Sequence, residues 1–156
     1  YKRQSVKCSN FIGETIDMAV ECGFEKMLLT GHIGKLVKVS GGIMNTHSRE
    51  ADCRVELLVA AGLRAGVSRD NLMKILDSAT TTEAIAYLEE EKKTKPVMDY
   101  LMERIIYYMN KRAGGKMKIE CILYDNQYGE LAKSEGAEEF LHELQHENVN
   151  ANETTI

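Results

Sequence analysis

The chain has 156 residues, of which 44% are hydrophobic and 28% are charged, and its net charge is −4 at pH 7. This composition predicts a folded globular domain with its own core and excludes a disordered polyelectrolyte. Because an acidic chain is repelled by a phosphate backbone, the charge also argues against a nucleic-acid partner, and no run approaches the ~18 apolar residues that a membrane span needs.

The four cysteines are spread through the chain and form no Cys-x-x-Cys pair. Each lies among apolar residues, so we expect buried free thiols rather than disulfides or zinc ligands. Together with the lack of a signal-peptide pattern, this favours a reducing, cytoplasmic location. Since the chain begins at Tyr1, we also expect it to be part of a longer protein.

The first elements predict a strand, a helix and a second strand. Residues 5–9 are expected to form a short strand, and apolar residues at helical spacing predict a helix over residues 10–22 that ends at Gly23. Residues 26–30 are short and apolar and are followed by Gly31, as in a buried strand. The short links predict that the two strands are parallel neighbours.

Helices dominate the middle of the chain. A brief helix is expected over residues 35–40, and a longer one over residues 50–65 with Leu63 facing the core. Ser68 and Thr80 have the pattern of helix N-caps, and Thr80 has a glutamate three residues later, as in a capping box. One more long helical pattern follows before the next strand.

The last predicted strand, residues 116–124, alternates between apolar and charged side chains, which is typical of a strand with one wet face or at a sheet edge. The expected fold class is therefore α/β: a single three-layer domain with a small, mostly parallel sheet flanked by helices and one alternating strand at an edge. We assign this domain to residues 1–134. Residues 135–156 are expected to be an acidic tail, with a weak helix near residues 137–146 and disorder from residue 148.

The segment Gly31-His32-Ile33-Gly34-Lys35 is the strongest local signal for a binding site. Ligands of open parallel sheets bind beyond the carboxyl ends of the strands, where glycines let a ligand approach the backbone and helix N-terminal amides attract an anion. With Lys35 and Lys38 nearby, we expect a phosphate or carboxylate site. It is not a Walker A loop, because Leu36 stands where that loop needs Ser or Thr. The alternative is that Gly31 and Gly34 only make a tight turn and Lys35 points into water.

A second polar loop follows Gly41-Gly42. Asn45 and Ser48 suit hydrogen bonding to a ligand, and Arg49 suits bidentate contact with a carboxylate. The alternative is an ordinary loop in which Thr46 or Ser48 caps the next helix.

His32 and His47 are the candidate catalytic residues, because imidazole exchanges protons near neutral pH. The two histidines and Cys53 could be imagined as a metal site, but a lone loop histidine is more often a hydrogen-bonding group, and Asp52 is the only carboxylate at ligand spacing nearby, so we expect no metal site. Because no Gly-x-Ser-x-Gly segment is present, the sequence does not support a serine hydrolase either.

Three segments together resemble a known family. They are Cys8-Ser9-Asn10-Phe11-Ile12-Gly13-Glu14, Gly31-His32-Ile33-Gly34-Lys35-Leu36-Val37-Lys38 and Gly42-Ile43-Met44-Asn45-Thr46-His47-Ser48. They are similar to the C-terminal half of the CbiD family, the cobalt-precorrin-5B C-1 methyltransferases. The similarity is dense over residues 5–77 and looser as far as residue 132, and the acidic tail matches no part of it.

This resemblance implies methyl transfer from S-adenosylmethionine to ring carbon C-1 of a cobalt-containing tetrapyrrole in the anaerobic route to cobalamin. It also implies that the N-terminal half of the enzyme is missing here, so we expect the isolated chain to be inactive. Which half binds S-adenosylmethionine stays open. The acetate and propionate groups of the substrate would suit Lys35, Lys38 and Arg49.

Two other functions are compatible with the sequence: a non-catalytic α/β module that binds an anion or nucleotide at Gly31–Lys35, and a structural half that contacts no ligand. The oligomeric state is unknown from the sequence. Because only a short helix separates them, we expect residues 31–35 and 45–49 to converge on one anion-binding cleft at the C-terminal edge of the sheet.

Overall fold

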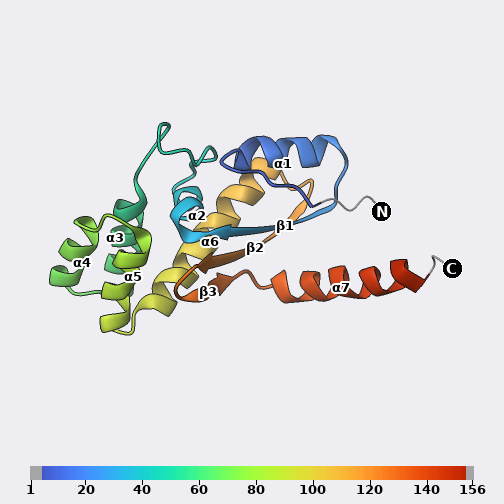
Figure 1. Ribbon diagram of the computed structural model, residues 1–156. Coiled ribbons are helices and arrows are strands. Elements are labelled where there is room, and N and C mark those ends of the chain that lie inside the picture. The colour runs from blue at the N-terminus through green and yellow to red at the C-terminus, as the bar shows by residue number, and fades with distance from the viewer. Residues whose placement is uncertain (1–4, 154–156) are drawn as a thin grey trace.

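The computed structural model describes the backbone of residues 5–153 and the side chains of residues 5–145. This part of the chain forms seven helices and a three-stranded sheet, which confirms the predicted α/β class (Figure 1). None of the described helices is long and apolar enough to cross a lipid bilayer.

The chain begins with an irregular segment, and the strand predicted over residues 5–9 is wrong. Residues 5–8 have no regular structure, and Ser9 and Asn10 form a turn before helix α1, Ile12–Glu21. The segment pairs with a loop instead of the sheet: Phe11 makes an isolated antiparallel bridge to Asn45, and the Thr46 amide donates to the Asn10 carbonyl at 2.9 Å. The predicted parallel pairing with residues 26–30 therefore does not form.

The sheet has the order β1-β2-β3, with β1 at Lys26–His32, β2 at Lys118–Asp125 and β3 at Gly129–Lys133. β1 and β2 are parallel, and β2 and β3 are antiparallel. The alternating strand β2 is thus central, and its predicted place at an edge is wrong. The edge position was predicted because Glu120 suggested a strand face exposed to solvent. Glu120 is only 8% exposed, and its buried carboxylate accepts hydrogen bonds from the Ser134 hydroxyl and the Gly136 amide.

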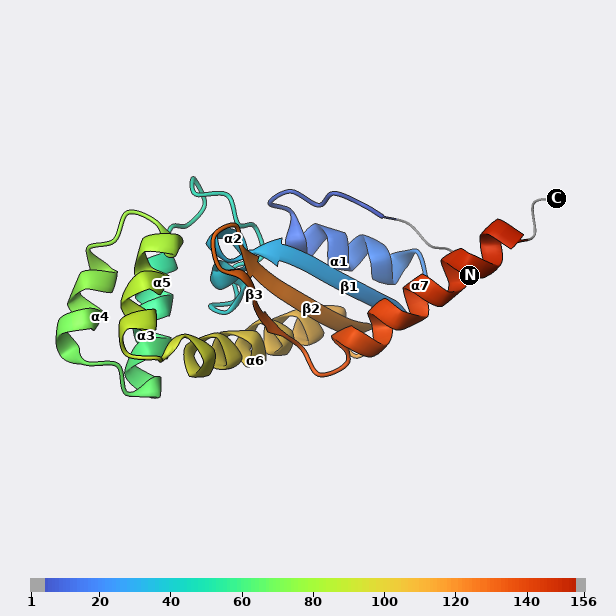
Figure 2. The same ribbon diagram turned by 60° about the horizontal axis from the view of Figure 1, so that its bottom comes forward.

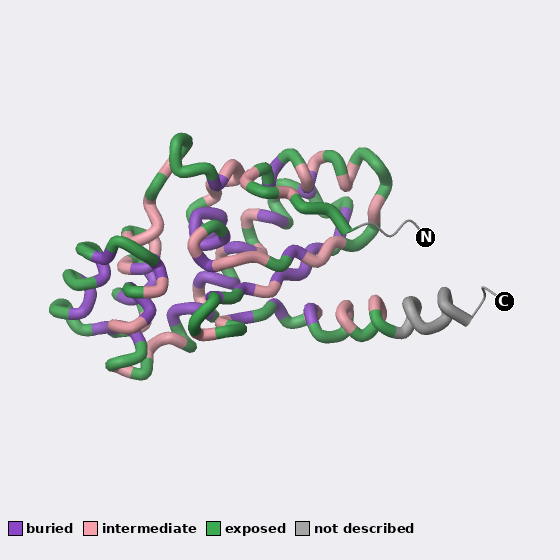
Figure 3. Tube along the Cα trace, in the orientation of Figure 1, coloured by how far each residue is buried: buried purple, intermediate pink, exposed green. Residues whose placement is uncertain are grey.

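One face of the sheet is covered by helices and holds the core. Helix α6, Thr94–Ala113, runs along β2 and β3, and α1 and α2, Ile33–Val39, pack beside it (Figures 1 and 2). Buried residues lie between the sheet and these helices and continue into the helices over residues 54–90 (Figure 3). The fully buried side chains of this cluster include Ile105, Met109 and Leu123.

Helices α3, Arg54–Ala65, α4, Arg69–Leu76, and α5, Thr81–Glu90, form a group at one end of α6 (Figure 1). The predicted caps are confirmed: Ser68 accepts a hydrogen bond from the Asn71 amide and Thr80 from the Glu83 amide. Helix α3 begins at Arg54 rather than residue 50, and Leu63 is 69% exposed rather than inward.

The second face of the sheet is contacted by α7, Ala137–Glu153, which then extends away from the body (Figure 2). The start of α7 is attached to the sheet by two contacts. The Gly136 amide, just before the helix, donates to the Glu120 carboxylate, and Lys26 forms a 2.6 Å ion pair with Glu143. Helix α7 includes residues 148–153, and residues 154–156 lie outside the described part of the chain, so the predicted disorder of the tail stays a prediction. The division into a domain at 1–134 and a tail at 135–156 stays a prediction.

All four cysteines are free, as predicted, but their expected burial is confirmed only at Cys121. Cys22 is exposed, because it follows the last turn of α1, while Cys8 and Cys53 are half-buried.

Candidate functional site

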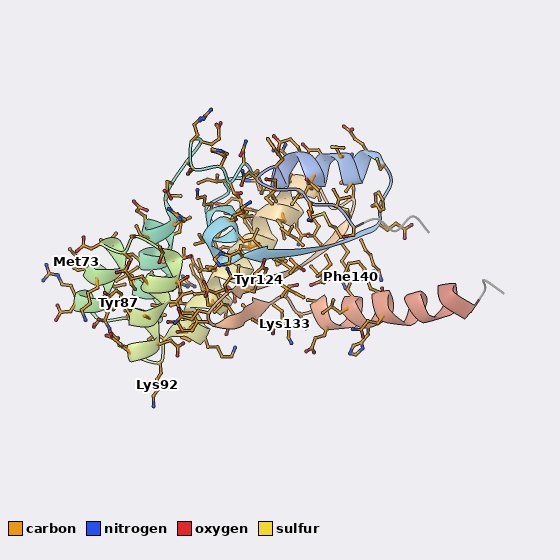
Figure 4. All side chains as sticks on the ribbon, viewed as in Figure 1. Met73, Tyr87, Lys92, Tyr124, Lys133 and Phe140 are labelled. Carbon is orange, nitrogen blue, oxygen red and sulfur yellow. The ribbon has the colours of Figure 1, made fainter. Side chains whose placement is uncertain are left out.

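The carboxyl ends of the parallel strands β1 and β2 meet at one edge of the sheet, where the first predicted site begins. His32 is the last residue of β1 and lies opposite Tyr124 of β2, which is labelled in Figure 4 where the sheet meets the α3–α5 group. His32 is also the N-cap of α2, because its Nδ1 accepts a 3.0 Å hydrogen bond from the Gly34 amide. That amide is therefore already bonded within the chain.

The two glycines of this turn are explained by packing. A Cβ at Gly31 would lie 2.7 Å from Leu36 Cδ1, and one at Gly34 would lie 3.2 Å from His32 Nδ1. A side chain at Gly31 would force Leu36 to shift, and one at Gly34 would crowd the His32 ring. Both positions match the tight-turn alternative that the sequence left open.

The two lysines of the predicted site have different environments. Lys35 is exposed. Lys38 is only 2% exposed, and its ammonium donates hydrogen bonds to the carbonyls of Thr46, at 3.2 Å, and Ala51, at 2.8 Å. Asp52 lies 3.9 Å from the same ammonium. Lys38 thus holds the second loop from inside the protein and is not available to a ligand.

The second loop, residues 43–53, is ordered by local hydrogen bonds. Asn45 Oδ1 accepts from the His47 amide at 3.1 Å, and His47 Nδ1 accepts from the Arg49 amide at 3.0 Å. Neither Thr46 nor Ser48 caps the next helix, whose N-cap residue is Cys53 and has no side-chain capping bond. The side chains of His47, Ser48 and Arg49 are exposed, and apart from the bond at His47 Nδ1 they have no hydrogen-bond partner among the described residues.

The two predicted loops lie at opposite ends of α2. Lys38, within α2, contacts the second loop directly, but no described hydrogen bond or ion pair joins residues 31–35 to residues 45–49. Their convergence on one cleft stays a prediction.

A group that the sequence did not indicate lies at the carboxyl edge of the sheet. The carboxylate of Asp125, the last residue of β2, is completely buried, and its Oδ2 lies 3.4 Å from His32 Nε2. The same oxygen accepts a 2.8 Å hydrogen bond from the Thr82 hydroxyl on α5. Oδ1 accepts from the amides of Gln127, at 2.8 Å, and Tyr128, at 3.3 Å, in the turn to β3.

These contacts keep Asp125 ionised. Burial acts to raise the pKa of its carboxyl, but the hydrogen bonds from the Gln127 amide, the Thr82 hydroxyl and the Tyr128 amide, with the charge of His32, outweigh burial and hold the pKa below its ordinary range. The ring of Tyr124 stands edge-on to that of His32, with 5.7 Å between the centroids. The end of β1 and β2 is thus a polar site with one buried negative charge.

A surface hollow of about 260 Å³ lies between the start of α3 and the start of α5. It is lined by Asp52, Arg54, Val55, Glu56 and residues 78–81. Its main charges are already paired, because Arg54 Nε donates to Asp52 Oδ1 at 2.7 Å. No cluster of three or more potential metal ligands occurs among the described residues.

Comparison with known proteins supports the resemblance seen in the sequence. The family model described as the CbiD C-terminal domain matches residues 45–135, which is more than half of the chain. No solved structure matches this chain.

Curated relatives carry the name cobalt-precorrin-5B C(1)-methyltransferase. The protein of Ruminiclostridium cellulolyticum is 44% identical over 128 residues, which are 82% of this chain and 33% of the relative. That of Methanocaldococcus jannaschii is 40% identical over 83% of this chain and 35% of its own length. That of Alkaliphilus metalliredigens is 36% identical over 96% of this chain and 39% of its own length.

The chain thus spans about a third of the length of the curated relatives that it matches. Within that span the family model extends from the polar loop at residue 45, through α3–α6, to the end of the β2–β3 hairpin. The chain therefore belongs to the CbiD family, and its matched region is the C-terminal domain of that family.

Proposed function

We propose that this chain provides the C-terminal domain of a cobalt-precorrin-5B C-1 methyltransferase. The observation that carries the proposal is the 44% identity, over 82% of the chain, to a relative with that name. The reaction would transfer a methyl group from S-adenosylmethionine to C-1 of a cobalt-containing tetrapyrrole, within the anaerobic synthesis of cobalamin. Because the chain spans about a third of such relatives, the remaining two thirds would be needed for turnover.

The exposed groups of the two loops would contact the carboxylates of the substrate. Lys35 and Arg49 offer free cationic side chains, and Ser48 offers a hydroxyl, while the Asn45 side chain is partly used by the His47 amide. Arg49 can grip a carboxylate with two parallel hydrogen bonds, which a lysine cannot. Lys38 is left out of this set because its ammonium is bonded to loop carbonyls.

S-adenosylmethionine would supply the electrophilic methyl group. The hollow between α3 and α5, about 260 Å³, is slightly smaller than the roughly 300–1,000 Å³ of usual ligand pockets, and its carboxylate Asp52 is paired with Arg54. We therefore assign no donor contact to the described residues.

The two candidate catalytic histidines differ in what they can do. His47 is exposed and keeps Nε2 open to water, since only its Nδ1 accepts an internal hydrogen bond. His32 has Nδ1 bonded to the Gly34 amide and Nε2 facing Asp125. In both rings, uptake of a proton at Nδ1 would break an amide hydrogen bond, so the two histidines differ only at Nε2, which is open to water in His47 and faces the Asp125 carboxylate in His32.

Replacing part of a relative tests the proposal most directly. If the region of the R. cellulolyticum protein that matches this chain is exchanged for this chain, the chimera should methylate cobalt-precorrin-5B at C-1. The chain alone should not. A folded chimera without activity, beside an active parent enzyme, would refute the proposed function.

Ligand contacts are tested separately on the isolated chain with uroporphyrin, an octacarboxylate tetrapyrrole. The double variant Lys35→Ala, Arg49→Ala should bind about three- to tenfold more weakly, as expected for the loss of two exposed ion pairs. The double variant Lys95→Ala, Lys111→Ala is the charge-matched control, because both lysines are exposed on α6, Lys95 to 82%. Binding of a nucleoside triphosphate but not of uroporphyrin would instead favour the non-catalytic anion-binding module.

A further inference from the structure

Asp125 is fully buried, and one of its carboxylate oxygens lies close to the His32 ring. Its side chain has no solvent exposure, and Oδ2 lies 3.4 Å from His32 Nε2. This distance is slightly longer than an ordinary N–H···O hydrogen bond and within the range of an ion pair. A buried carboxylate requires compensation, and the imidazole N–H is its one potential partner on β1.

The opposite side of the His32 ring determines which nitrogen carries the proton. Nδ1 accepts a hydrogen bond from the Gly34 amide at 3.0 Å. A ring nitrogen that accepts a hydrogen bond carries no proton, so the neutral ring must be protonated on Nε2. The nitrogen that carries the proton is then the one that lies 3.4 Å from Asp125 Oδ2.

We propose that Asp125 is a positioning residue that holds His32 in the Nε2-protonated tautomer. Nδ1 is consequently the only nitrogen of His32 that can take up a proton. Uptake there ends the bond from the Gly34 amide, which then needs another acceptor, such as a ligand oxygen. The imidazolium formed is balanced by the Asp125 carboxylate on its other side.

A purely structural role is the alternative. Asp125 also binds the amides of Gln127 and Tyr128 and the hydroxyl of Thr82, so it could serve only to attach the β2–β3 turn to α5. In that case the Gly34 amide alone would set the tautomer of His32. The two roles differ in what replacement of the carboxylate does to the ring.

The test uses histidine ¹⁵N spectra of the isolated chain at about pH 8.5, above the range in which histidines usually titrate. The wild type should show His32 as the Nε2-protonated form. Asp125→Asn should change the tautomer ratio about tenfold or more toward Nδ1–H, because the charged group beside Nε2 is replaced by an amide that can donate to Nε2. His47 is the internal reference, since its Nδ1 has the same kind of bond, from the Arg49 amide, without a facing carboxylate.

Thr82→Val is the matched control, because it removes the neighbouring hydroxyl and leaves the charge. It should keep the wild-type tautomer. An Nδ1-protonated His32 in the wild type, an unchanged ratio in Asp125→Asn, or an equal change in Thr82→Val would each overturn the proposal. If Asp125→Asn does not fold, Asp125→Ser serves, since its hydroxyl still accepts from the turn amides.

The inference deepens the proposed function at His32, but its test does not use the reaction. If Asp125 controls the tautomer of His32 but the chimera is inactive, only the proposed methyltransferase function is refuted. An active chimera with a tautomer independent of Asp125 would refute only the positioning role.

Discussion

Lys38 offers a sharp test of the site, because the sequence suggests a ligand contact and the structure shows an internal one. Its side chain is 2% exposed and donates to two carbonyls of the loop that precedes α3, those of Thr46 and Ala51. Lys38→Met keeps the straight aliphatic stem and removes the ammonium. The loop then loses both hydrogen bonds at once.

The cost follows from burial of the two carbonyls. Thr46 is 3% exposed, so its carbonyl stays without a partner, which costs about 1–3 kcal/mol. Ala51 is half-buried, and water can replace part of its bond. We expect Lys38→Met to lower the free energy of unfolding by about 2–4 kcal/mol, a large share of the roughly 5–15 kcal/mol of a typical domain.

Urea denaturation followed by circular dichroism measures this loss, and limited proteolysis reports the loop. Lys35→Met is the control, because Lys35 is exposed three residues earlier and its replacement should change stability by less than about 0.5 kcal/mol. Equal stabilities of the two variants would show that the buried ammonium does not hold the loop. A variant of Lys38 that folds normally but loses uroporphyrin binding would restore its predicted ligand role.

Three further outcomes are expected. Gly42→Ala should destabilise the fold by about 1–3 kcal/mol, because Gly42 has φ +85° and the added Cβ would lie 2.9 Å from the Tyr108 ring. Urea denaturation measures this loss, and an unchanged free energy of unfolding would contradict the prediction. The pKa of Asp125 is held below 3.8, so its stabilisation is present above the unfolded pKa and is lost as pH falls through the folded value. Unfolding measured from pH 6 to pH 2 should therefore lose stability more steeply in the wild type than in Asp125→Asn, and parallel curves would refute the assignment. Iodoacetamide should modify the exposed Cys22 rapidly and spare Cys121, because burial raises the pKa of the Cys121 thiol to about 12. Mass spectrometry measures the labelling of each cysteine, and comparable labelling of the two would contradict the burial of Cys121.

Local signals predicted much of the helical structure. Each of the N-caps at Ser68 and Thr80 depends on residues only three positions apart, and the structure has both. The failures are at strands. β1 pairs with β2 across five intervening helices, and no spacing within either segment specifies that partner.

Burial of polar residues explains the other errors. Glu120 suggested a strand face exposed to solvent. Its carboxylate is instead buried and accepts hydrogen bonds from the Ser134 hydroxyl and the Gly136 amide, just before α7. Lys38 suggested a solvent-facing cation, yet the loop that it holds closes over it. In both cases the compensating partner comes from another element, so composition alone could not distinguish a buried charge from an exposed one.

The two histidines carry the same lesson into the site. In each, Nδ1 accepts a hydrogen bond from the amide two residues later, at 3.0 Å, so local geometry does not separate them. What separates them is the partner of Nε2. His47 faces water, whereas the parallel pairing of β1 with β2 places His32 opposite Tyr124 and next to the buried Asp125. The environment that distinguishes His32 from His47 therefore depends on the pairing of two strands that are distant in the sequence. For this reason the sequence predicted His32 as a candidate residue but did not predict its partner Asp125.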